Sequence, residues 1–98
     1  MATYATLYKF TDQGIRAVRE SPNRVRAAID MAQGVGIKVV GVYYTHGPYD
    51  MVVISEADDE KTATAFALTT ASLGNVTSTT MRAFRLDEFE EIIARMPD

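Results

Sequence analysis

Stretches of strand-like composition alternate along the chain with stretches whose apolar residues have helical spacing. Runs of β-branched and aromatic residues predict four strands, over residues 3–10, 37–45, 49–56 and 75–85. Apolar residues three and four positions apart predict a helix after the first strand, a second before the last strand and a third at the C-terminus. This βαββαβ order with a terminal helix is typical of a ferredoxin-like α+β fold, in which helices cover one face of a four-stranded antiparallel sheet.

Capping and breaking residues mark the first helix. Residues 11–14 are interpreted as a break after the first strand. Ser21 before Pro22 predicts the N-cap and first turn of the helix, because serine accepts a backbone N–H and proline has none to lose. Gly34 and Gly36 predict its end, since glycine accepts the left-handed conformation found there.

Charge and spacing mark the other two helices. The acidic residues 58–60 predict the start of the second helix, because negative charge complements the dipole there, and Gly74 predicts its end. Asp87 and Glu90 have the spacing of a capping box and predict the start of the last helix. That helix has an apolar stripe, made of Phe89, Ile92, Ile93 and Met96.

The two middle strands lack a polar face. They are joined by a turn at residues 46–48, so we expect them to pair antiparallel. Val39 and Val40 point to opposite faces, and residues 51–54 are apolar on both. An antiparallel sheet with one face in water would instead alternate apolar and polar positions. Because the helices cover one face only, we expect a second copy of the chain to cover the other, which makes the protein a homodimer or a higher homo-oligomer.

The composition of the chain limits the functions that it can have. Ninety-eight residues, 47% apolar and 23% charged, predict one globular domain over residues 1–98. A net charge of -3 argues against a nucleic-acid binder. Without cysteine there is no thiolate ligand or nucleophile, and His46 is the single histidine, so we expect no metal and no cofactor.

Charge is unevenly distributed, with six Lys/Arg against three Asp/Glu in residues 1–49 and four against ten in residues 50–98. We interpret these as solvated helix faces and helix starts. Anion binding or partner docking is the alternative for the arginines of the first half, which are Arg16, Arg19, Arg24 and Arg26. The chain shows no signal peptide, and its apolar runs are far shorter than the roughly 20 residues that span a bilayer, so a cytoplasmic protein without a membrane partner is expected.

Four segments carry a resemblance to a known family. They are Phe10–Gly14, Gly47–Asp50, Leu73–Val76 and Thr79–Phe84. Together and in this order they resemble the GYD-domain family of small bacterial proteins, with a proline inserted between the glycine and tyrosine of the naming motif. The resemblance implies a dimeric α+β barrel and covers almost the whole chain. It implies no reaction, because the wider superfamily includes cofactor-free oxygenases, haem enzymes, stress proteins and amino-acid-sensing domains.

The hairpin between the middle strands carries most of the candidate chemistry. His46 is a candidate general base, because its ordinary pKa lies near neutrality. Asp50 is a candidate to orient it, and Tyr49 or Tyr44 to donate a hydrogen bond. The alternative is that His46 and Asp50 are turn residues, with the aspartate accepting backbone N–H groups.

Arg82 is a second candidate, on the same face of the last strand as Thr80 and Phe84. A strand arginine among hydroxyl and aromatic groups is suited to holding a carboxylate ligand. The alternative is an ion pair with Glu56 or Asp50.

Tyr8 is a third candidate, on one face of the first strand together with Tyr4, Thr6 and Phe10. Such a face is suited to an aromatic ligand pocket, and core packing is the alternative. RNA binding is not expected, since residues 51–55 lack the basic-glycine-aromatic signature.

The leading functional hypothesis is a homo-oligomeric small-molecule-binding or regulatory protein, with its ligand between sheet and helices or at the dimer seam. Its site would draw on Tyr8, Tyr44, Tyr49 and Arg82, with His46 and Asp50. The alternatives are a small cofactor-independent enzyme, oxygenase-like or isomerase-like, with His46 as general base, and a purely structural assembly protein.

Overall fold

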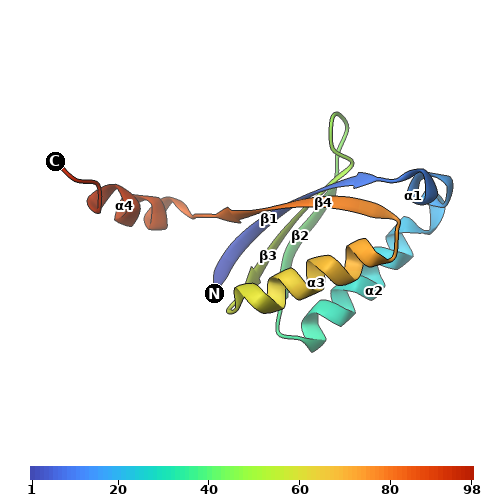
Figure 1. Cartoon of the computed structure of the whole chain (residues 1–98), viewed down its shortest axis with the longest axis horizontal. Coiled ribbons are helices and arrows are strands. Elements are labelled where there is room, and N and C mark those ends of the chain that lie inside the picture. Colours follow the sequence, from blue (N-terminus) through green and yellow to red (C-terminus); the bar gives the residue numbers. More distant parts are fainter.

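One antiparallel sheet with two helices along one face forms the body of the molecule, in a computed structural model that describes residues 1–98 (Figure 1). The strands lie in the order β2-β3-β1-β4. Their bounds are Ala2–Phe10 for β1, Lys38–Tyr44 for β2, Met51–Ala57 for β3 and Val76–Ala83 for β4. The covering helices are α2 (Ser21–Gly34) and α3 (Glu60–Ser72). The predicted ferredoxin-like α+β fold is confirmed, and none of the helices is long and apolar enough to cross a membrane.

The segment between β1 and α2 is more ordered than the sequence pattern indicated. The predicted break contains a short helix, α1 (Asp12–Arg16), followed by a 3₁₀ turn, η1 (Val18–Glu20). Thr11 caps α1, because its hydroxyl accepts a hydrogen bond from the Gly14 N–H at 3.1 Å. A five-residue helix is too short to show an apolar periodicity, which explains why the pattern predicted a break.

The start of α2 also differs from the prediction. The N-cap position is Glu20, and Ser21 is the first residue of the helix. The Ser21 hydroxyl does not cap the helix, because it is buried and hydrogen-bonded to the Tyr44 hydroxyl of β2 at 2.8 Å. The predicted end is confirmed: α2 stops at Gly34, and Gly36 has a left-handed φ of 84°.

Strand register divides the side chains between two faces. Tyr4, Thr6 and Tyr8 are buried toward the helices, where Met51 and Val53 of β3 also line the space below the sheet. The opposite face has no helix over it (Figure 1). We call it the open face, and its paired apolar side chains are Ala5 and Leu7 of β1, Val52 and Ile54 of β3, Tyr43 of β2 and Met81 of β4. The prediction that the middle strands are apolar on both faces is confirmed.

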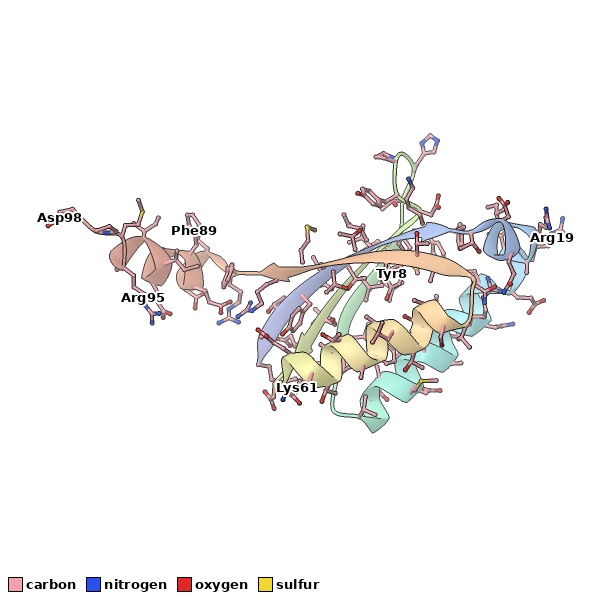
Figure 2. All side chains as sticks on the ribbon, viewed as in Figure 1. Tyr8, Arg19, Lys61, Phe89, Arg95 and Asp98 are labelled. Carbon is pink, nitrogen blue, oxygen red and sulfur yellow. The ribbon has the colours of Figure 1, made fainter.

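The last helix, α4 (Leu86–Ala94), stands away from the body as an arm that continues the direction of β4 (Figure 1). Its apolar stripe is largely uncovered: Phe89 is 52% exposed and Met96 just after the helix 66% (Figure 2). The predicted capping box is wrong by two residues, because the Glu88 carboxylate accepts the Arg85 N–H at 3.0 Å.

The arm makes the chain extended for its size. Its radius of gyration is 15.0 Å, whereas a compact domain of this length has about 13 Å. Its accessible surface is 6875 Å², whereas a compact monomer of this mass exposes about 5,540 Å². About 1,300 Å² of surface is therefore exposed that a compact fold of this size would bury.

Candidate functional site

A cavity lies between the sheet and the two covering helices. Its volume is about 110 Å³, and 12 of its 16 lining residues are hydrophobic, among them Val25 and Ile29 of α2 and Phe66 of α3. Tyr8 points into this space from β1 (Figure 2). Burial raises the pKa of the Tyr8 hydroxyl, against a smaller opposing effect of its hydrogen bond to Thr70. The tyrosine therefore stays neutral at physiological pH and offers the cavity a hydroxyl group.

A smaller chamber of about 40 Å³ adjoins this cavity and shares four lining residues with it, which are Tyr8, Val39, Val53 and Phe66. Its far wall includes Tyr4, whose hydroxyl is buried and has no hydrogen-bond partner. The nearby Thr6 and Thr80 hydroxyls bond to each other at 3.3 Å. A mainly apolar cavity thus adjoins a smaller chamber that contains one unpaired hydroxyl.

Polar side chains surround the outer end of the cavity. The Ser21 hydroxyl, bonded to Tyr44, lines it together with Arg24 and Asn75. The Arg24 guanidinium donates to the Ala17 carbonyl at 3.0 Å. Tyr44, predicted as a ligand-binding residue of the hairpin, is thus held at the edge of α2, because its hydroxyl bonds to a serine 23 positions earlier. No local sequence signal links two residues so far apart.

In the hairpin, Asp50 is tied to the backbone of β1. Its carboxylate accepts the Phe10 N–H at 2.8 Å, and its own N–H donates to the Tyr8 carbonyl at 2.8 Å. His46 is exposed at the turn and forms no hydrogen bond or ion pair with Asp50. These contacts support the interpretation of Asp50 as a turn-locking residue, and the catalytic roles of the two side chains stay predictions.

Tyr49 and Lys9 meet beside the same turn. The ring of Tyr49 lies 5.9 Å from the Lys9 ammonium, measured to the ring centroid, and is half-buried. The contact joins the hairpin to β1 by a weak cation–π attraction. The structure does not bring Tyr49 into the cavity, whose lining includes Tyr8 but not the hairpin residues 45–50.

Arg82 lies on the helix-facing side of β4, opposite Tyr4 in the register. Its guanidinium forms an ion pair with Glu88 of α4 at 3.6 Å and lies 4.5 Å from the centroid of the Phe84 ring. The pairing with Glu56 or Asp50 considered from the sequence is not the one observed. Arg82 thus connects β4 to the base of the arm, and its role in holding a ligand stays a prediction.

Two of the resemblance segments meet at the end of β1, in a contact that we call the junction. The Thr11 hydroxyl donates to the Gly74 carbonyl at 2.6 Å, and the Gln13 amide donates to the Leu73 carbonyl at 3.1 Å. The Thr11 N–H donates to the Asn75 carbonyl at 3.1 Å. These motif residues hold the loop before β4 against the end of β1, so their observed contacts are structural.

Replacing Asp50 with alanine is expected to lower the free energy of unfolding by about 2 kcal/mol, because a charged acceptor of a half-buried backbone N–H is lost. Urea denaturation followed by circular dichroism measures the change. The matched control is His46→Ala in the same turn, which we expect to leave the midpoint unchanged because the imidazole is exposed. Equal midpoints for the two variants would show that Asp50 does not lock the hairpin.

Known proteins share this sequence pattern and fold. The model of the GYD domain matches residues 4–93. A protein of Thermus thermophilus named glutamine synthetase and cystathionine beta-lyase binding protein is 32% identical over 97 residues, which are 98% of this chain and 99% of that protein. The crystal structure of FFRP-DM1 matches with a TM-score of 0.60 at 23% identity, over 86% of this chain and 100% of the other. The crystal structure of a protein from Thermus thermophilus matches with a TM-score of 0.56 at 26% identity, over 87% of this chain and 95% of the other.

Proposed function

The chain belongs to the GYD domain family, and on that premise we propose that it is a homodimeric regulatory protein of the bacterial cytoplasm, which acts by binding metabolic enzymes and a small molecule. The observation that carries the proposal is the surface that one chain leaves uncovered. The apolar open face and the apolar stripe of α4 are both exposed to water. Large exposed apolar patches on a protein mark sites of interaction with another molecule.

The uncovered surface has the size of a protein interface. A stable dimer buries about 800 Å² on each partner, and this chain exposes about 1,300 Å² more than a compact monomer of its mass. A second copy suits the open face, because a two-fold dimer pairs one surface patch with itself. Tyr43, 63% exposed, and Met81, 44% exposed, would then become part of a shared apolar layer between two sheets.

The arm supports the same assembly. α4 cannot reach the open face of its own sheet, because it extends beyond the end of β4 (Figure 1). Its stripe would be covered in the dimer by the partner's body. Light scattering at micromolar concentration tests this part of the proposal, with twice the chain mass of 10.8 kDa expected and a monomer contradicting it.

The enzyme-binding part rests on the name of the relative from Thermus thermophilus, which matches this chain over nearly its full length. The structure offers a docking surface for it at the end opposite the arm, where Arg16 and Arg19 are exposed and form no ion pair (Figure 2). Charged rims of this kind speed and orient protein association. We assign the contact with the enzyme to this basic end, which covers α1, η1 and the start of α2.

Replacing Arg19 with glutamate is expected to weaken binding to purified host glutamine synthetase or cystathionine beta-lyase about tenfold, because the change reverses a charge at the interface. Biolayer interferometry with each purified enzyme measures the affinity. The matched control is Lys61→Glu, the same charge reversal at an exposed position near the other end of the sheet (Figure 2).

Each result decides part of the proposal. Binding that is weakened by Arg19→Glu and kept by Lys61→Glu supports the basic end as the docking surface. Binding that both variants weaken equally overturns that assignment. A wild-type dimer that binds neither enzyme overturns the enzyme-binding role and leaves the dimer standing.

A further inference from the structure

We propose that the two adjoining cavities under the sheet bind a small neutral molecule with an apolar body and one hydrogen-bond acceptor, which the Tyr4 hydroxyl holds at the inner end. The inference deepens the small-molecule part of the proposed function and rests on it. It needs only one chain, since every lining residue belongs to the same molecule.

The unpaired hydroxyl is the first reason. Tyr4 is 8% exposed, and its oxygen has no partner. A buried hydroxyl without a hydrogen bond is costly, and native proteins leave few of them. The neighbouring Thr6 and Thr80 hydroxyls bond to each other at 3.3 Å, and neither forms a hydrogen bond with the Tyr4 oxygen. A bound molecule that brings an acceptor to Tyr4 would gain a hydrogen bond that the empty protein lacks.

The volume sets the size of the ligand. The two chambers measure about 110 and 40 Å³ and share four residues. An apolar cavity of about 150 Å³ in another protein holds benzene. A molecule of roughly six to eight non-hydrogen atoms therefore fits, with its body against Val53 and Phe66 and its acceptor toward Tyr4.

The lining sets the charge of the ligand. No residue of the inner chamber carries a formal charge, and its polar groups are hydroxyls. A carboxylate or ammonium placed there would lose its hydration without a counter-ion. The one charged lining residue of the larger cavity is Arg24, which lies at the outer end and is engaged with Ala17. The site therefore favours a ketone, ester, lactone or similar neutral molecule over an amino acid.

The test compares two probes of similar shape, cyclohexanone and cyclohexane, of which only the ketone has an acceptor. Titrations followed by ¹H–¹⁵N correlation spectra give both affinities and locate the shifted signals. Replacing Tyr4 with phenylalanine is expected to weaken cyclohexanone binding about tenfold and leave cyclohexane binding unchanged. Tyr43→Phe removes an exposed tyrosine hydroxyl from the open face and is expected to change neither.

A cavity-filling variant separates this inference from the broader proposal. Ala28→Leu adds volume to the lining of the larger cavity and is expected to abolish binding of both probes. If circular dichroism shows that the Ala28→Leu variant does not fold, Ala67→Leu serves as the filling variant instead, because Ala67 lies in the wall of the inner chamber.

The outcomes are distinct. Ketone binding that Ala28→Leu abolishes and Tyr4→Phe leaves intact overturns the role of Tyr4 and keeps a ligand in the cavity. Binding that survives the filling variant, or no binding of either probe to the wild type, overturns the cavity site and with it the small-molecule part of the proposed function. Neither result bears on the binding of enzymes at the basic end.

Discussion

Replacing Phe89 with aspartate is expected to raise the dissociation constant of the proposed homodimer at least about a thousandfold. Phe89 is the first residue of the apolar stripe of α4 and is 52% exposed, on the arm that stands away from the body of the chain (Figure 2). Burying a phenylalanine contributes about 2–3 kcal/mol. A two-fold dimer loses that contribution twice, so the change amounts to about 4–6 kcal/mol in dimer stability.

The measurement is light scattering coupled to gel filtration over a range of protein concentrations. We expect the wild type to remain dimeric where Phe89→Asp elutes at the mass of a single chain. The matched control is Glu90→Gln, a change at the next position, outside the apolar stripe. A Phe89→Asp variant that stays dimeric at every concentration would show that the arm has no part in the dimer interface. The open face would then remain as the proposed interface.

Replacing Gly14 with alanine is expected to destabilise the fold by about 3 kcal/mol. A methyl group at this position would lie 1.9 Å from the carbonyl oxygen of Asn75 and 2.8 Å from its carbonyl carbon. These are backbone atoms, so they cannot rotate away. The same carbonyl oxygen accepts the Thr11 N–H. The methyl group therefore forces the junction apart and breaks hydrogen bonds that hold β1 to the loop before β4.

Thermal unfolding at one fixed protein concentration measures this effect, with a fall of about 15 °C in the midpoint expected for a domain of this size. The matched control is Gly34→Ala, because no atom lies within 4 Å of the added methyl group and the residue has helical backbone. We expect the control to melt at or slightly above the wild-type temperature. Similar midpoints for the two variants would contradict the close packing at Gly14.

The sequence predicted the fold because its signals are local. Strand composition, the glycines after α2 and α3, and the acidic start of α3 each act within a few residues of the element that they define. The apolar character of residues 51–54 on both faces correctly indicated a sheet with an uncovered side. The short helix α1 was missed, since so few residues carry little periodicity. The start of α4 was misplaced because Asp87 and Glu90 have the same spacing as the true pair, Arg85 and Glu88.

The candidate site was harder to predict because its contacts join distant positions. Tyr44 bonds to Ser21, and Arg82 pairs with Glu88 across the turn into the arm. The sequence grouped Tyr44 with His46 by proximity along the chain, whereas the structure places it at the edge of the cavity. The unpaired hydroxyl of Tyr4 depends on what surrounds it in three dimensions, which no local pattern reports.

The position of β1 in the sheet has a consequence for synthesis. β1 leaves the ribosome before the other three strands of the sheet, but it lies between β3 and β4, and its residues 3–10 pair with residues 76–83 of the last strand. Pairing so distant in sequence is slow to form. Until β4 has been translated, β1 has an unpaired edge that is open to mispairing with other nascent chains. A chain that ends before residue 76 thus retains an incomplete sheet, and translation must pass that point before the N-terminal strand is protected on both sides.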